Sequence, residues 1–415
     1  AIGRLFWPIV RHPWIARRLV ELQVEKQFLR LTSARRRAGQ AGRIRQVSVR
    51  ITDRCNLRCE TCGQWGPEGY LHGQDLAALK NAEVPLERYQ ELLADLTRRG
   101  HHPVFYLWGG EPMLYRGALD LIQTAADLRL PTAIATNGTL LARSADRLVT
   151  APLFLLQISV DGPTAEIHNR IRPCAGEGDN FAQVEEGIEA VRAARRARRR
   201  GLPLLATLTT ISRANLRHLA EIRRAFARRV DAMVFYLAWW IDEPRARQHE
   251  AEFARRFGST PRRHRGWIGG WKPDDFSALE EELAAVTAPR PGEAPVVLLP
   301  NIRGADRLRA YYTDHAERFG YDHCLSICQA IEVNSNGDVS PCRDYHDYVV
   351  GNIKNATLTE LWNSEPYQRF RRSLAAVMEW RREHLHELVG VQAAMLNAKL
   401  RGHYEYYGRP TNYRR

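Results

Sequence analysis

Between residues 46 and 240, short apolar runs alternate with helical stretches, and this alternation constrains the fold more than any other feature of the chain. Six runs rich in β-branched and aromatic residues are expected strands: 47–51, 104–108, 133–136, 154–160, 204–210 and 233–239. Amphipathic helical patterns lie between them, at 86–99, 119–128, 181–199 and 216–228. Repeated strand–helix units predict an α/β fold with a parallel sheet and helices outside it. Six units are too few for a closed eight-unit barrel, so we expect a partial, open barrel over residues 47–240.

The segments before and after residues 47–240 lack this alternation of strands and helices. Residues 1–46 are basic, with apolar residues at helical spacing, and predict a helix packed on the barrel. A peripheral contact of this helix with a membrane surface is the alternative. Residues 241–314, rich in Arg, Pro, Gly and Trp, are expected to form an insertion or linking region. Residues 315–372 predict a small C-terminal α+β unit, and residues 373–415 a helix and a tail.

The bulk composition limits the class of protein. The chain has 415 residues, 44% of them apolar, which suits one large domain and a smaller one. No stretch approaches the roughly 20 apolar residues of a membrane span, and no signal-peptide pattern opens the chain. We therefore expect a cytoplasmic protein. The net charge of +14 is scattered over several arginine runs without a nucleic-acid motif, so nucleic acid is not an expected partner.

The cysteines point to metal binding. There are seven, an odd number in short spacings, which argues against a disulfide framework. Cys55, Cys59 and Cys62 have the spacing C-x3-C-x2-C directly after the first expected strand. Thiolates select zinc, copper or iron–sulfur clusters, and structural zinc needs a fourth ligand that is missing locally. Three thiolates can hold three irons of a 4Fe–4S cube and leave the fourth iron open. A zinc site with a distant fourth ligand is the alternative.

This loop resembles the signature of the radical S-adenosylmethionine (radical SAM) superfamily. The resemblance implies a partial (β/α)6 barrel and a 4Fe–4S cluster whose open iron binds the amino and carboxylate groups of S-adenosylmethionine (SAM). It implies that an electron, delivered by a reductant such as flavodoxin or ferredoxin, breaks the S–C5′ bond. The resulting 5′-deoxyadenosyl radical would then take a hydrogen atom from the substrate, which makes the chain an expected enzyme.

Three further strand ends agree with the resemblance. The segment Gly109, Gly110, Glu111, Pro112 matches the family's GGEP motif, which contacts the methionine amino group. Thr136 and Asn137 belong to a TNG pattern, and Ser159 and Asp161 to an SVDG pattern; in the family these flank the cofactor ribose and carboxylate. Arg172 resembles an arginine that could pair with the cofactor carboxylate, and a surface role is its alternative. All these residues should meet at the C-terminal mouth of the barrel.

Cys324, Cys328 and Cys342 form a second group. An Asn-Gly turn at 336–337 predicts a hairpin before Cys342, and the region resembles the start of SPASM and twitch domains. The resemblance implies an auxiliary 4Fe–4S cluster on these three thiolates, and only one, because no cysteine follows Cys342. His323, Asp344 and His346 are candidates for a fourth ligand, and zinc is again the alternative. Cys174 is too remote in sequence to place and is expected to be a buried or free thiol.

The sequence says less about the substrate than about the cofactor and the clusters. Modification of a peptide or protein side chain is the first hypothesis, because many SPASM-bearing enzymes act on peptides. Oxidation or rearrangement of a small molecule, such as a sugar, nucleotide or lipid precursor, is the second. In that case Trp239, Trp240, Trp267 and Trp271 could wall a pocket, although ordinary packing also explains them. Tyr106, Tyr236, His323 and His346 could act near the substrate, and no residue qualifies as a general base.

Overall fold

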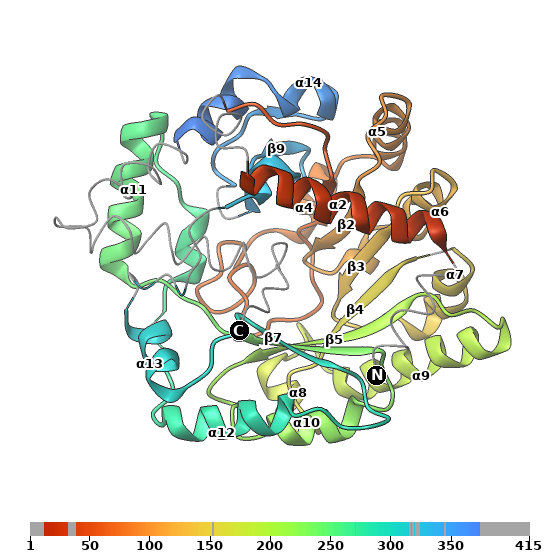
Figure 1. Ribbon diagram of the computed structural model, residues 1–415, viewed down its shortest axis with the longest axis vertical. Helices are drawn as coiled ribbons and strands as arrows, with labels where there is room; N and C mark the ends of the chain where they lie inside the picture. The colour runs from red at the N-terminus through yellow and green to blue at the C-terminus, as the bar shows by residue number, and fades with distance from the viewer. Residues whose placement is uncertain are drawn as a thin grey trace.

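The computed structural model describes residues 12–31, 39–151, 153–269, 271–314, 317, 319, 324–343 and 346–373. Within them, ten strands form one sheet in the order β10-β9-β8-β1-β2-β3-β4-β5-β6-β7 (Figure 1). Their bounds are β1 Gln46–Thr52, β2 Val104–Gly109, β3 Thr132–Thr136, β4 Leu155–Ser159, β5 Leu204–Ile211, β6 Ala232–Leu237, β7 Val296–Leu299, β8 Ala330–Val333, β9 Asp338–Ser340 and β10 Gly351–Asn352.

The six expected strands are confirmed as β1 to β6. Each pairs in parallel with the next along the chain, as repeated strand–helix units require. A seventh parallel strand, β7, lies beside β6 and comes from the segment expected to be an insertion. In the described sheet β7 stands at one end and β10 at the other, so the barrel is open.

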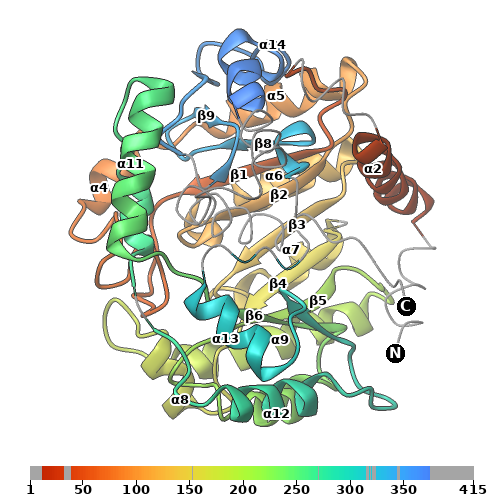
Figure 2. The same cartoon turned by 60° about the vertical axis from the view of Figure 1, so that its left-hand side comes forward.

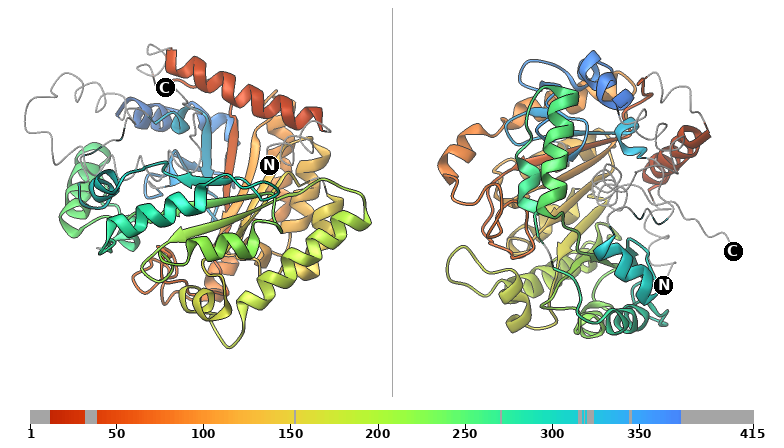
Figure 3. Two further views of the ribbon diagram at one scale, coloured as in Figure 1. Left: turned by 60° about the horizontal axis from the view of Figure 1, so that its bottom comes forward. Right: turned by 90° about the vertical axis from the view of Figure 1, so that its left-hand side faces the viewer.

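Helices cover the outer side of the curved sheet (Figures 1 and 3). Those of the barrel are α5 Leu86–Arg98, α6 Ala118–Asp127, α7 Ala145–Thr150, α8 Ala165–Ile171, α9 Asn180–Ala197 and α10 Leu219–Phe226. Helix α4 Leu76–Ala82, in the segment between β1 and β2, contains no buried residue. The following segment adds α11 Glu243–Phe257, α12 Phe276–Thr287 and α13 Ala305–Thr313. The side chain of Asp179 caps α9 by accepting from the Ala182 N–H, and Gly258, with a φ of 74°, ends α11.

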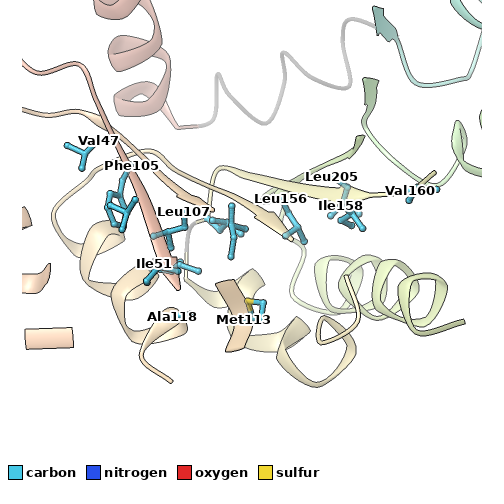
Figure 4. Packing of buried hydrophobic residues seen from close by; sticks show 14 of the residues in the cluster. Val47, Ile51, Phe105, Leu107, Met113, Ala118, Leu156, Ile158, Val160 and Leu205 are labelled. Atoms are coloured by element: carbon cyan, nitrogen blue, oxygen red, sulfur yellow. The ribbon is translucent and has the colours of Figure 1, made fainter. Parts of the chain in front are cut away.

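Alternation along the strands separates the core from the barrel interior. On β1, Val47, Val49 and Ile51 face the helices and belong to the main hydrophobic core, as Figure 4 shows for this region. The intervening Ser48, Arg50 and Thr52 are also buried but face inward. Because side chains of a strand alternate between faces, the same sequence supplies the core on one side and polar groups on the other.

Helix α2 (Pro13–Leu31) lies at the N-terminal ends of the strands. Ile15 packs on three residues at the starts of β4 and β5: Phe154, Leu202 and Leu204. Arg45, just before β1, forms ion pairs with Glu21 and Glu25 at 3.4 and 3.1 Å. The helix therefore packs on the barrel at the mouth opposite the sequence motifs. Its contact with a membrane stays a prediction, and none of the described helices is long and apolar enough to cross one.

The C-terminal unit shares the sheet of the barrel. Strand β8 pairs in parallel with β1, from Gln46 opposite Ala330 to Val49 opposite Val333. Strands β9 and β10 follow in antiparallel pairing, and the expected hairpin turns at Gly337, whose φ is 92°. Helix α14 (Leu358–Trp362) then starts at a capping box. The unit therefore continues the sheet past β1 (Figure 2).

Candidate active site

The first cysteine group lies on the loop after β1, and N–H groups point at its sulfur atoms. The Leu57 N–H donates to Cys55 Sγ and the Trp65 N–H to Cys62 Sγ, each at 3.4 Å. The Arg172 guanidinium donates to Cys59 Sγ at 3.7 Å. Such donors stabilise sulfur atoms that carry negative charge, as in thiolate ligands. Burial raises the pKa of the Cys59 thiol to about 12 and that of Cys55 still further, so iron must displace protons to bind.

The segment around Cys174 runs along this loop. Cys174 forms an antiparallel bridge with Leu57, and the Arg58 N–H donates to the Pro173 carbonyl at 2.8 Å. The Ala175 N–H donates to the Asn56 carbonyl at 2.9 Å. Sequence spacing could not place Cys174, because the pairing joins residues more than a hundred positions apart. Its sulfur donates to the Gly178 carbonyl at 3.6 Å, so Cys174 supports the loop through its backbone.

Gly109 and Gly110 bring the end of β2 against the same loop. The Gly110 N–H donates to the Thr52 carbonyl and the Glu111 N–H to the Arg54 carbonyl, both at 2.8 Å. A Cβ atom on Gly110 would lie 2.2 Å from the Arg54 oxygen. Only glycine permits this approach. The contact expected between this motif and the cofactor amino group remains a prediction.

The Glu111 carboxylate is fully buried and binds the neighbouring strand end. Its Oε1 accepts from the Met113 N–H at 3.0 Å and from the Thr136 hydroxyl at 2.7 Å. Its Oε2 accepts from the Asn137 N–H at 2.7 Å. Burial raises the pKa of Glu111, while these three donors act in the opposite direction. The side chain thus joins the ends of β2 and β3, and it is not among the residues that line the cavity described below.

Asn137 connects the end of β3 to the cysteine loop. Its amide donates to Asn56 Oδ1 at 2.8 Å and approaches Cys55 Sγ at 4.0 Å. The Asn56 amide in turn donates to the Thr139 hydroxyl at 2.9 Å. Pro112, Thr136 and Asn137 are all buried at this mouth of the barrel.

The end of β4 holds a buried ion pair. Asp161 is fully buried, and its Oδ2 accepts from Arg172 Nε at 2.6 Å while its Oδ1 accepts from the Thr210 N–H at 2.8 Å. Arg172 therefore has two partners, Asp161 and Cys59, and a role as a surface arginine is wrong because its side chain is only 13% exposed. Ser159 and Arg172 both face the cavity. Pairing of Arg172 with a cofactor carboxylate remains a prediction.

The second cysteine group is buried as one cluster. Cys324, Cys328 and Cys342 pack together with Ile327 and Phe370 and are each less than 10% exposed. Burial raises the pKa of Cys324 to about 12. Two of the expected fourth ligands, His323 and Asp344, lie outside the described residues. His346 is described, and it faces the cavity between the rings of Tyr70 and Trp108.

A cavity of about 960 Å³ opens at the C-terminal mouth. Inward-facing strand residues form one wall, including Trp108 and Tyr236, whereas Tyr106 is not among the lining residues. The four expected tryptophans line it: Trp239, Trp240, Trp267 and Trp271. Trp239 and Trp267 stack with ring centroids 4.7 Å apart. A Cβ on Gly63 would lie 2.4 Å from the Trp267 ring, so this wall touches the residue after Cys62.

The cavity lining also includes residues that the sequence analysis did not predict, among them Tyr70, Arg213 and Arg343. Tyr70 follows the cysteine loop, and its hydroxyl accepts from the buried Arg50, which pairs with Asp53 at 3.0 Å. Arg343 directly follows Cys342, and this adjacency was the one signal that could have indicated it. Its guanidinium lies 4.2 Å from the centroid of the Trp108 ring.

Comparison with protein families agrees with this geometry. Residues 49–226 match the model of the radical SAM superfamily. This part of the chain is a radical SAM domain. Residues 324–386 match SPASM, an iron–sulfur cluster-binding domain. The chain is therefore a radical SAM enzyme whose cofactors are SAM, a 4Fe–4S cluster and auxiliary iron–sulfur at the SPASM domain.

Two curated relatives match most of this radical SAM chain. An AdoMet-dependent heme synthase of Oleidesulfovibrio alaskensis is 24% identical over 337 residues, which cover 79% of this chain and 76% of the relative. A pre-heme d1 synthase of Dinoroseobacter shibae is 26% identical over 317 residues, which cover 75% of this chain and 71% of the relative.

Solved structures show the shared fold. Streptococcus suis SuiB bound to S-adenosylmethionine has a TM-score of 0.55 at 15% identity, covering 82% of this chain and 70% of SuiB. The enzyme anSMEcpe with bound AdoMet and the Cp18Cys peptide has a TM-score of 0.53 at 17% identity. The match covers 88% of this chain and 97% of anSMEcpe. The partial barrel expected from the sequence is therefore confirmed.

The cysteine loop fits the cluster of a radical SAM enzyme. Its sulfur atoms receive N–H donors, and its donor set is three soft thiols with no fourth local ligand. Among the described residues, no group of three or more His, Cys, Asp or Glu side chains is gathered around one point for a single metal ion. An iron–sulfur cube instead engages each thiolate through a different iron.

Proposed function

We propose that this radical SAM enzyme removes a hydrogen atom from a small, flat, tetrapyrrole-like molecule bound in the tryptophan-lined cavity. The cavity carries the proposal, because its 960 Å³ lies at the upper end of the usual range for small-molecule sites. Its indole rings suit a flat aromatic ligand. Two relatives that match along most of the chain are named for heme and pre-heme d1 synthesis, which supports a tetrapyrrole.

Cys55, Cys59 and Cys62 would hold the cluster that supplies the electron for SAM cleavage, and Cys324, Cys328 and Cys342 the auxiliary cluster. The chain's own residues then define where the substrate reacts. The Trp239–Trp267 stack touches the cysteine loop at Gly63, so a molecule lying on these indoles is close to the cleavage site. Arg343 and His346, which follow the auxiliary Cys342 closely in sequence, line the same cavity.

The test is anaerobic reconstitution with iron and sulfide, followed by reduction with dithionite and measurement of 5′-deoxyadenosine. We expect about eight iron atoms per chain, and release that increases when coproporphyrin, a tetrapyrrole with four carboxylates, is added. Cys55→Ala should abolish release. Cys342→Ala should retain release without product. Absence of 5′-deoxyadenosine from the reconstituted wild-type protein would contradict the proposal.

Modification of a peptide side chain, the first hypothesis from the sequence, is the second candidate. Support comes from the fold of SuiB, which has also been solved bound to its precursor peptide SuiA, with a TM-score of 0.55 and coverage of 86% of this chain. A short acidic peptide tested beside the tetrapyrrole separates the two. Stimulation of 5′-deoxyadenosine release by the peptide alone would favour the second candidate.

A further inference from the structure

A small recess adjoins the main cavity. Its volume is about 10 Å³, and five of its eight lining residues also line the cavity. Its polar lining consists of Tyr70, Arg263, His264, Arg343 and His346. Two guanidinium groups, two imidazoles and a phenol thus converge where the cysteine loop, the 241–314 segment and the C-terminal unit meet.

Arg263 is the residue that marks this recess as an anion site. Among the described residues, its buried Nη1 has no hydrogen-bond partner and its guanidinium forms no ion pair. A buried guanidinium nitrogen without an acceptor is unfavourable unless a ligand supplies one. The guanidinium also lies 6.0 Å from the centroid of the ring of Tyr70, which lines the same recess.

The acidic groups nearby are already bound elsewhere. The Asp347 carboxylate accepts from the backbone N–H groups of Arg262 and Arg263, both at 3.0 Å. Glu250 contacts His264 at 3.1 Å and Arg265 at 2.6 Å. Among the described residues, no carboxylate lines the recess itself, whereas two guanidinium groups do.

Arg343 is the second arginine of the recess, and contacts with Trp108 and Ser48 orient its guanidinium. Its guanidinium lies on the face of Trp108 and donates to the Ser48 hydroxyl at 3.4 Å. Stacking of this kind orients the planar fork of an arginine, and such forks bind carboxylates in pairs of parallel hydrogen bonds.

We propose that this recess binds a carboxylate of the substrate, between Arg263 and Arg343. The proposal rests on the proposed function and narrows it to substrates that carry a carboxylate on a flat ring system. The recess has room for about one water-sized group, which matches a carboxylate oxygen reaching in from the cavity. The ring system then lies over the tryptophans while the anion is anchored beside the auxiliary cysteines.

The experiment uses quenching of tryptophan fluorescence in the full chain by two probes. Coproporphyrin carries four carboxylates, and its tetraamide is the uncharged twin. We expect the wild-type protein to bind the acid about ten- to a hundredfold more tightly than the amide. Arg263→Met should lose most of this preference through weaker binding of the acid, while its affinity for the amide stays the same. Arg263→Lys should keep part of the preference for the acid over the amide.

Arg262→Met is the matched control, because Arg262 is adjacent, exposed and absent from the recess lining. It should behave as the wild type, and iron content with thermal unfolding checks that each variant is folded. An unchanged preference in Arg263→Met, equal binding of acid and amide by the wild type, or binding of neither overturns the proposal. Because 5′-deoxyadenosine release is measured separately, failure of the recess is distinguishable from failure of the enzyme assignment.

Discussion

At the scale of single residues, the site depends on buried polar groups whose partners come from other strands. Glu111 illustrates this, since two of its three donors, the Thr136 hydroxyl and the Asn137 N–H, come from the end of β3. Arg50 is another case: its charge is buried in the barrel and balanced by Asp53 at 3.0 Å. Asp53 also accepts from the Ser335 hydroxyl at 2.7 Å, which connects the cysteine loop to the C-terminal hairpin.

Replacing Glu111 by Gln should destabilise the protein. The amide NH2 would face at least one of the three donors, and a buried donor without an acceptor costs about 1–3 kcal/mol. We therefore expect the free energy of unfolding to fall by about that amount, with weaker SAM binding. Chemical denaturation and equilibrium binding of SAM check this. Glu87→Gln, at an exposed position on α5, is the control and should change neither.

His168 should make stability depend on pH. It is fully buried, and burial, with the nearby Arg172, lowers its pKa to about 3. The unfolded chain takes up a proton near pH 6.5 and the folded chain does not. The free energy of unfolding is therefore highest above pH 6.5 and falls as pH decreases, by about 1.4 kcal/mol per unit from this residue.

Urea denaturation between pH 5 and 8 measures this slope. His168→Asn should reduce it by about that contribution, because Asn has no titrating group. His72→Asn, at an exposed histidine, should leave the slope as in the wild type. An identical slope in the His168 variant would show that another group is responsible.

At the scale of elements, loops from successive strands pack against one another with backbone contacts. The end of β2 lies on the cysteine loop through Gly110, and the wall of the cavity lies on it through Gly63. These contacts fix the loop from two sides, so its shape depends on segments far away in the sequence.

Gly110→Ala tests the first contact. A Cβ 2.2 Å from the Arg54 oxygen forces the two loops apart, because backbone cannot yield as a flexible side chain can. We expect SAM cleavage to fall at least about a hundredfold, in the range of other displaced active-site groups, with partial loss of iron from the first site. Gly176→Ala is the matched control, since nothing lies within 4 Å of a Cβ at that position. If the Gly110 variant cleaved SAM at the wild-type rate, the close contact between Gly110 and Arg54 would not be required for cleavage, contrary to this prediction.

At the scale of the whole molecule, the barrel and the C-terminal unit are one sheet. Strand β1 pairs with β2 on one side and with β8 on the other, so neither of its edges is open. All seven residues of β1 are buried. The cavity also uses residues from three segments of the chain: Tyr70 follows the cysteine loop, Trp267 belongs to the 241–314 segment and Arg343 to the C-terminal unit. The enzyme therefore depends on the C-terminal unit for stability as well as for a second cluster.

A chain truncated after residue 314 should consequently fail to form the native barrel. Removal of β8 exposes the unpaired edge and apolar residues of β1, which favours aggregation. Solubility and the iron content of the first site measure this. The double variant Cys324→Ser, Cys328→Ser keeps β8 and should remain soluble with about four irons per chain. A soluble truncated chain that retains the first cluster would show that the two units fold independently.

The sequence by itself determined the local features. Strand–helix alternation located β1 to β6, and the spacing of Cys55, Cys59 and Cys62 indicated the cluster, because such signals depend on neighbouring residues. The motifs after β2, β3 and β4 could be assigned to one mouth, since parallel strands place their C-terminal ends together. The Asn-Gly turn indicated the hairpin of the C-terminal unit in the same way.

Only the tertiary structure decided what depends on distant pairing. It placed β8 beside β1, added β7 to the barrel and set Cys174 against Leu57. It directed the Glu111 carboxylate toward β3 and brought Arg263 and Arg343 to one recess. Such contacts join residues tens to hundreds of positions apart, and they are chosen by burial and hydrogen bonding of the whole chain, which no local pattern encodes.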